Sequence, residues 1–123
     1  MIALTLPVPP SVNNWTRALG RGRQVKTRAA RDYMARVATI CQAAKVRPYR
    51  EPVRVTFTWY RARRAGDLDN RLKVGLDSLC GYAFGDDRWV EEIIARRVDG
   101  EAPARIEVTV EPIDPRPARS EAA

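Results

Sequence analysis

The sequence predicts a single domain of mixed α/β (α+β) class, in which helices cover a small mixed sheet. At 123 residues, the chain has the size of one ordinary domain with a small buried core. Segments with two-residue hydrophobic alternation are interspersed with two segments of helical period, which gives the element order β-α-β-α-β-β. We expect this domain to span residues 1–112 and the polar, proline-rich stretch 113–123 to be disordered.

The first half of the chain predicts a strand, a loop and a helix. Alternating apolar residues indicate a strand at residues 2–6, which should end where the following prolines remove backbone donors. The basic segment SVNNWTRALGRGRQVKTR is interpreted as an irregular loop. From about residue 27 to residue 44, apolar side chains follow the i, i+3, i+4 rhythm of an amphipathic helix: Ala30, Tyr33, Met34, Val37, Ile40, Cys41 and Ala44.

The second half predicts a long strand, a helix and two further strands. Residues 53–60 alternate between apolar and polar side chains, as in a strand with one buried face. Four leucines then fall within an arc of about 80° at helical spacing, and they predict a helix with one buried stripe: Leu68, Leu72, Leu76 and Leu79. Asp67 occupies the expected N-cap. Beyond a loop at 80–87, residues 90–98 and 105–111 are typical of strands.

Charge is distributed unevenly along the chain. Lys and Arg number 22 against 15 Asp and Glu, for a formal net charge of +7. Residues 1–50 carry ten basic residues and one acid, whereas residues 51–123 carry twelve basic residues and fourteen acids. A basic half of this kind favours a polyanionic partner such as nucleic acid, with solubility alone as the alternative.

The residue types that the chain lacks exclude several kinds of catalytic and metal site. The chain has no histidine, which excludes Ser-His-Asp triads, zinc sites with histidine ligands and nucleases with a histidine base. Cys41 and Cys80 form no paired motif and are typical of reduced, structural thiols. With no signal peptide or membrane-length apolar run in the sequence, we expect a cytoplasmic protein that does not contact membranes.

Acidic residues gather in two short motifs, GDLDNRLK and GDD. Asp69, Lys73 and Asp77 fall on successive turns of one helix face, beside the leucine stripe. Hard oxygen donors that converge from a helix start and a nearby loop suit Mg²⁺ or Mn²⁺, with Asp86 or Asp87 as the loop donor. The combination therefore predicts a metal site that faces a phosphodiester.

Each of these residues also has a purely structural interpretation. Asp67 can be an N-cap and Asp69 a first-turn acid that the helix dipole favours. Lys73 can form a surface ion pair with Asp69, four residues earlier. Asp86-Asp87 after glycine can be a plain turn.

Basic residues form a second candidate site, for DNA. A loop with two glycines carries Arg17, Arg21, Arg23, Lys26 and Arg28, and such a flexible arm suits contacts to backbone phosphates. Arg61, Arg63 and Arg64 precede the acidic motif and are candidates for the same surface. Any single arginine among them can instead be a solvated side chain.

Three motifs together resemble the RusA-type Holliday junction resolvases: LPVPPSVNNWTR at the start, D-x-D-N-x-x-K at residues 67–73, and the closing GDD. The resemblance implies a homodimeric, Mg²⁺-dependent endodeoxyribonuclease that nicks a four-way DNA junction symmetrically, with Mn²⁺ as a possible substitute ion. It implies Asp67, Asp69 and Asp87 as the catalytic, metal-holding acids and Lys73 as the essential lysine. The loop between Asp77 and GDD is one residue shorter than in one known member of the family, so Asp86 stays open as the third ligand.

The resemblance also bears on partners and origin. It places Asn14 near the site and implies a bacterial or phage-encoded, nucleoid-associated protein. Two nicks on a junction with two-fold symmetry call for two symmetric sites, and Trp89, Ile93 and Ile94 are candidates for the dimer surface. Trp15 is a candidate for the site as well, and its alternatives are the core and the dimer surface. Two other functions remain open: a nuclease for flaps or forks, and a non-catalytic DNA-binding module.

Overall fold

The computed structural model describes residues 1–62 and 66–113 of the chain. Arg63, Arg64 and the expected tail beyond Ile113 lie outside the described residues. Within them, the α+β architecture is confirmed. No helix in these two ranges is long and apolar enough to cross a membrane.

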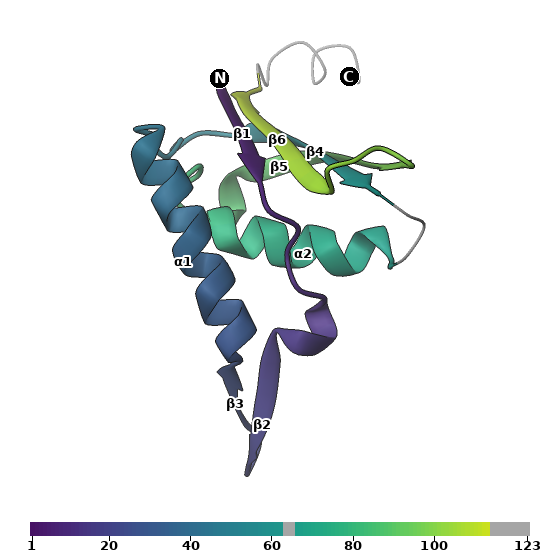
Figure 1. The fold of residues 1–123 in the computed structure, drawn as a ribbon. Coiled ribbons are helices and arrows are strands. Elements are labelled where there is room, and N and C mark those ends of the chain that lie inside the picture. Colours follow the sequence, from purple (N-terminus) through teal and green to yellow (C-terminus); the bar gives the residue numbers. More distant parts are fainter. Residues whose placement is uncertain (63–65, 114–123) are drawn as a thin grey trace, which may run out of the picture.

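One four-stranded sheet forms the centre of the fold (Figure 1). Its strands lie in the order β1-β6-β4-β5, and β4 runs parallel to β5 but antiparallel to β6, which in turn pairs antiparallel with β1. The bounds are β1 Ile2–Leu6, β4 Val53–Arg61, β5 Val90–Asp99 and β6 Arg105–Pro112. Each predicted strand is therefore present, with ends displaced by one residue at most.

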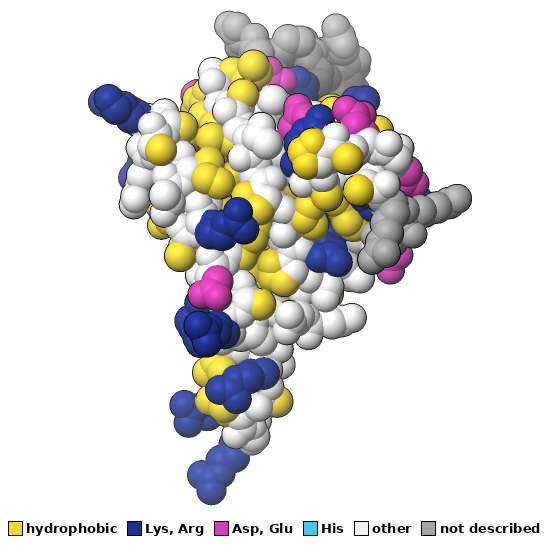
Figure 2. Space-filling view, in the orientation of Figure 1, with side chains coloured by type: hydrophobic (Ala, Val, Ile, Leu, Met, Phe, Trp, Pro, Cys, Tyr) yellow, Lys and Arg dark blue, Asp and Glu magenta, His cyan; other side chains and the backbone are white. Residues whose placement is uncertain are grey.

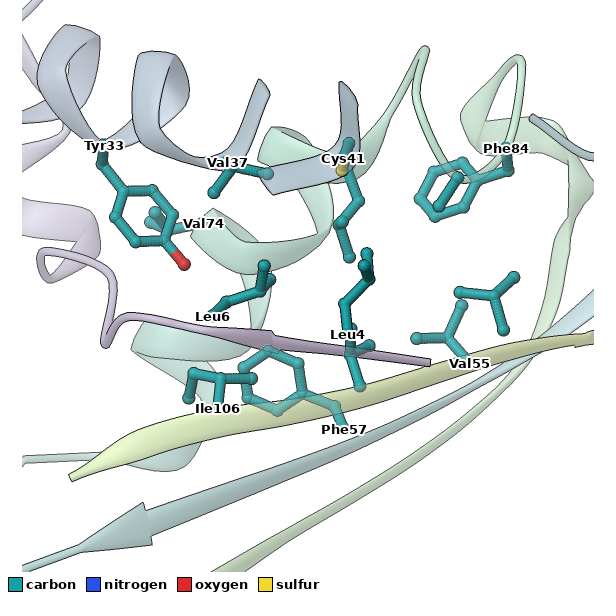
Figure 3. Close-up of a cluster of buried hydrophobic side chains, with 14 of the residues drawn as sticks. Leu4, Leu6, Tyr33, Val37, Cys41, Val55, Phe57, Val74, Phe84 and Ile106 are labelled. Atoms are coloured by element: carbon teal, nitrogen blue, oxygen red, sulfur yellow. The ribbon is translucent and has the colours of Figure 1, made fainter. Parts of the chain in front are cut away.

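Two helices cover one face of this sheet, α1 (Arg28–Ala43) and α2 (Leu68–Leu79) (Figures 1 and 3). The alternating residues of β4 that face the helices are at most 4% exposed, and α1 meets them with the buried side chains of Tyr33, Val37 and Cys41. Figure 3 shows these α1 residues above Leu4, Leu6 and the β4 side chains. Burial of this single face is what the period-two and helical patterns predict.

The most deeply buried face of helix α2 is offset from the predicted leucine stripe, although it shares Leu79 with the stripe. Its fully buried residues are Val74, Gly75, Ser78 and Leu79, whereas Leu68, Leu72 and Leu76 are only partly buried. Gly75 allows the close approach, because a Cβ there would lie 2.7 Å from the Phe57 ring. The Ser78 hydroxyl is satisfied by donating to the Val74 carbonyl at 2.9 Å. Leu79 of the predicted stripe is thus fully buried, and the other three leucines pack against the core with partial burial.

The basic segment predicted as an irregular loop is instead a short 3-10 helix, η1 (Val12–Asn14), followed by a hairpin of β2 (Thr16–Gly20) and β3 (Arg23–Lys26). Gly20, Arg21 and Gly22 all have positive φ and make the turn. The hairpin projects from the body of the protein, and several basic side chains lie along its visible face, among apolar and other atoms (Figures 1 and 2). Most of its residues are exposed, so it lacks the apolar alternation that reveals a strand.

Candidate active site

A pocket of about 340 Å³ lies between α2, the start of β5 and the short 3-10 helix η2 (Asp87–Trp89). Its polar lining is Asp69, Lys73, Asp77 and Asp87. Its apolar lining is Leu72, Leu76, Phe84, Val90 and Ile93. Two leucines of the α2 stripe, Leu72 and Leu76, thus line this pocket, whereas Leu79 lies in the core.

Helix α2 supplies the acids and the lysine from one face. Asp69 is exposed in the first turn, where its Oδ1 accepts the Asn70 amide at 3.0 Å. Lys73 extends its Nζ to within 4.0 Å of Asp77 Oδ2, one turn further along. The lysine therefore pairs with Asp77, not with Asp69 as the spacing suggests. Both members of this pair are solvent-accessible, which leaves the ammonium able to contact a ligand in the pocket.

The two acids of GDD have different roles in the structure. Asp86 Oδ1 accepts the Arg88 amide at 3.0 Å and caps η2. Asp87, one residue later, lines the pocket. Burial raises the pKa of the Cys80 thiol, and a hydrogen bond with the Asp87 carboxylate raises this pKa further. Of the two candidates for the loop donor, Asp87 is the one beside Asp69 and Lys73.

Asp67 occupies the N-cap position of α2 as predicted, with extended backbone angles, but its side chain accepts no capping hydrogen bond. It is exposed and does not line the pocket. Its carboxylate lies within electrostatic range of the Arg61 guanidinium. A capping hydrogen bond therefore does not explain why an aspartate stands at this position.

The sequence model of the family described as endodeoxyribonuclease RusA matches residues 6–111 of the 123-residue chain. The chain belongs to the RusA family. No curated protein matches it. The match spans all three motifs that carry the resemblance and includes both α2 and η2.

Membership establishes the class of activity. RusA proteins are endodeoxyribonucleases, hydrolases of DNA phosphodiester bonds that act on branched DNA and resolve Holliday junctions in recombination. They generally depend on a divalent metal ion. A family of this kind needs acids for a metal and basic residues for DNA, and this RusA chain presents both on its surface.

Among the described residues, no three carboxylate or thiol side chains gather closely enough to form a complete metal-ion site. The donor set nevertheless fits Mg²⁺. This ion retains several waters and is commonly bound through one or two carboxylates together with substrate phosphates. Asp69 and Asp87 offer such hard oxygen donors in one pocket, and Asp67 lies two residues before Asp69.

A cluster around Trp59 supports the segment that enters the acidic motif. The Arg61 side chain is 3% exposed, and its Nε lies 2.5 Å from Asp99 Oδ1. Its Nη1 donates to the Gly66 carbonyl at 2.7 Å. Arg71 donates to the Pro9 carbonyl. Both guanidinium groups lie over the Trp59 ring, at 5.2 and 5.4 Å from its centroid. Arg61, expected to contact DNA, is thus committed within the fold.

Sequence reasoning missed this cluster, because its members lie far apart along the chain. Asp99 ends β5 and Pro9 follows β1, so neither partner could be read from local spacing. The one local sign of the cluster in the sequence was that Arg61 follows Trp59 at the two-residue spacing of the buried β4 residues, where an apolar side chain is expected. An arginine at the end of an apolar alternation indicates a buried ion pair.

The remaining basic candidates among the described residues are exposed and concentrated at the hairpin. Arg17, Arg21, Arg23 and Lys26 belong to β2, β3 and their turn, and Arg28 begins α1. Asn14 ends η1, and its carbonyl accepts the Thr27 hydroxyl at 2.7 Å. The open alternatives for Trp15 are settled in favour of the core: it is 5% exposed and makes an edge contact with Tyr33.

Proposed function

We propose that this RusA-family protein is a Mg²⁺-dependent homodimeric enzyme that resolves four-way DNA junctions by paired symmetric nicks. The observation that carries the proposal is the pocket where Asp69, Lys73 and Asp87 meet from two different elements. This arrangement places acidic oxygens and a cation around one space that is open to solvent. It matches the chemistry of a family that hydrolyses DNA phosphodiester bonds.

The acids are assigned to metal binding. Asp69 and Asp87, which both line the pocket, would hold the ion, and Asp67, whose carboxylate accepts no capping hydrogen bond, would join them from the helix start. A bound Mg²⁺ ion supplies a water of lowered pKa as nucleophile and neutralises charge on the scissile phosphate. Fixed carboxylates on a helix position the ion with little reorganisation.

Lys73 is assigned to the transition state. Its ammonium lies one turn from Asp69, where it can stabilise the negative charge that develops on the phosphate or orient the attacking water. The chain has no histidine that could serve instead. Lys73 therefore contacts the reacting group and is a catalytic residue in this proposal.

Binding is assigned to residues outside the pocket. The exposed hairpin cations contact backbone phosphates, which orient the junction without reading its sequence. Asn14, at the base of the hairpin, and Arg28, at the start of α1, belong to the same DNA-binding surface.

Junction cleavage by wild type and by Asp69→Asn, with Mg²⁺ or Mn²⁺, tests this function. We expect wild type to make paired symmetric nicks and the variant to bind the junction but not to cut it. Asp32→Asn is the matched control, because it makes the same chemical change at an exposed position on α1. Its cleavage should equal that of wild type.

The choice of substrate decides between this function and the alternatives. A flap and a linear duplex are assayed beside the four-way junction. Faster cutting of flaps would instead indicate a nuclease for other branched DNA. Wild-type binding without any nicks under either ion would leave a DNA-binding module and contradict the proposal.

A further inference from the structure

Leu19 exposes an apolar side chain near the tip of the β2–β3 hairpin. It is 46% exposed, and it is the hairpin's member among the large hydrophobic residues that the described part of the chain leaves exposed. A single exposed leucine is ordinary on a protein surface. What distinguishes Leu19 is its backbone geometry, the charge around it and the support of the strands that carry it.

Leu19 is the extra residue of a β-bulge. Ala18 lies opposite Gln24 and Gly20 lies opposite Arg23, so within the described strands Leu19 has no residue opposite it. A bulge leaves its extra residue unpaired and redirects the side chain. A Cβ built at Gly20 would meet no described atom within 4 Å, so the space beside Leu19 at the tip is open to a large ligand.

The charged residues around Leu19 on the hairpin are all basic. Arg17, Arg21 and Arg23 are exposed, and the first acid of the chain is Asp32, inside α1. Figure 2 shows both hydrophobic and basic side chains on the projecting hairpin. A protein groove would need an acidic rim to receive such a tip. DNA instead offers phosphates to the arginines and apolar base faces to the leucine.

The base of the hairpin is fastened to the core. Trp15, which immediately precedes β2, is 5% exposed and makes an edge contact with Tyr33. The amide of Thr27, immediately after β3, donates to the Trp15 carbonyl at 3.1 Å. The Lys26 ammonium lies 5.3 Å from the centre of the Trp15 ring. Both strands are therefore held where they leave the body of the protein, and the tip has the support that inserting a side chain into another molecule requires.

We propose that Leu19 is a wedge that inserts between base pairs at the branch point of a DNA junction, while the hairpin arginines contact the flanking phosphates. Apolar side chains, leucine among them, enter between bases in this way in proteins that bend DNA. The inference rests on the proposed function for its branched substrate and adds the residue that recognises the branch.

Insertion at a branch point favours a junction over a linear duplex. A wedge costs the stacking energy of the bases that it separates. The base pairs at a branch point lie where one arm ends and the next begins, so separating them costs less than opening a continuous duplex. Leu19 thus supplies structure selectivity that phosphate contacts alone lack, because every duplex presents phosphates.

A fluorescent adenine analogue whose emission rises on unstacking tests the wedge. One four-way junction carries it at the branch point and a second carries it within an arm, and EDTA prevents cleavage. We expect wild type to raise the emission at the branch point and not within the arm. Leu19→Ala should lose this rise and bind the junction about tenfold more weakly, with unchanged affinity for a linear duplex.

Two further substitutions of Leu19 separate a wedge from a phosphate contact. Leu19→Met keeps an apolar side chain of similar size and should keep the rise in emission. Leu19→Lys adds a cation, so it should abolish the rise while strengthening binding to a linear duplex. Val25→Ala is the matched control, because it shortens an apolar side chain of the same hairpin that is paired in the ladder, opposite Arg17. It should behave as wild type does.

Three results would overturn the inference. The first is a wild-type complex in which the emission at the branch point equals that of the free junction. The second is the same rise in emission with Leu19→Ala as with wild type. The third is a shift in the sedimentation of the DNA-free protein on Leu19→Ala, which would assign the leucine to contact with a second copy of the chain.

The fluorescence needs no metal and is therefore independent of cleavage. Unstacking at the branch point that depends on Leu19, in a protein that never nicks a junction, would refute the proposed function and leave this inference standing. Paired nicks by a protein whose Leu19→Ala variant unstacks the branch point as wild type does would do the reverse.

Discussion

The β2–β3 hairpin and the α2 pocket differ in the sign of their charged side chains and in how firmly the rest of the fold holds them. The hairpin is basic and mostly exposed, and its strands pair only with each other. The charged residues of the pocket lining are mainly acidic, and its helix is packed against the sheet at the close contact of Gly75 with Phe57. One region is an extended arm, and the other is built on rigid elements.

This contrast follows from what each task demands of geometry. Phosphate contacts gain most of their affinity from long-range, salt-dependent attraction, which tolerates variation in the position of each cation. Hydrolysis requires its groups to be held within fractions of an ångström. We therefore expect substitutions in the two regions to change different quantities, affinity for the hairpin and rate for the pocket.

The largest expected effect is on the rate. Lys73→Ala should slow junction cleavage about 10²–10³-fold, because a preorganised charge at the transition state is lost. Junction affinity, measured by titration at constant salt, should remain near the wild-type value. Lys45→Ala is the control, since it removes an exposed lysine that does not line the pocket. Equal losses of affinity and rate would make Lys73 a DNA-binding residue and would contradict the separation of binding and catalysis between the two regions.

The hairpin should affect affinity instead. Replacing Arg17, Arg21 and Arg23 by alanine should reduce the slope of log affinity against log salt by about one for each phosphate contact removed. The cleavage rate at saturating DNA should not change. The control replaces Arg36, Arg47 and Arg50, three exposed arginines outside the hairpin. If both triple variants lower the slope equally, the arm has no special role in binding.

The packing of α2 can be tested without DNA. Gly75→Ala should lower the free energy of unfolding by about 1–3 kcal/mol, because its Cβ would overlap the Phe57 ring. Urea denaturation measures the change. Gly85→Ala is the matched control: its φ is not positive, and the nearest atom to its Cβ would be 3.6 Å away. Similar losses in both variants would show that the close approach of helix and sheet is not the cause.

How far the sequence predicts this structure depends on whether an element buries one face. In β4 and α1 the apolar periodicity predicts both the element and its buried residues, because the core covers one side of each. The hairpin buries neither side and therefore leaves no such pattern. In α2, two surfaces compete: leucines line the pocket, while a glycine and a serine face the core.

In the candidate site too, the sequence predicts what depends on local spacing and not what depends on side-chain directions or distant residues. Asp69 and Lys73 could be predicted together because four residues span one helical turn. The pairing of Lys73 with Asp77, and the different roles of Asp86 and Asp87, depend on side-chain directions that spacing does not determine. The burial of Arg61 depends on Asp99, which lies 38 residues away along the chain.

The smallest expected effect compares two helix starts. Thr27 caps α1, since its hydroxyl accepts the Ala30 amide at 3.1 Å, whereas Asp67 at the same position of α2 accepts no amide. Thr27→Ala should therefore lower the free energy of unfolding by about 1 kcal/mol and leave cleavage unchanged. Asp67→Ala should cost only the few tenths of a kcal/mol of a helix-dipole interaction, yet abolish cleavage.

Urea denaturation and the junction assay on both variants give the two readouts. A stability loss in Asp67→Ala equal to that of Thr27→Ala, with cleavage intact, would make Asp67 an ordinary cap. The opposite result would assign the carboxylate at the start of α2 to the reaction rather than to capping. The two helix starts would then differ in the same way as the two regions: one holds the fold together, and the other performs the chemistry.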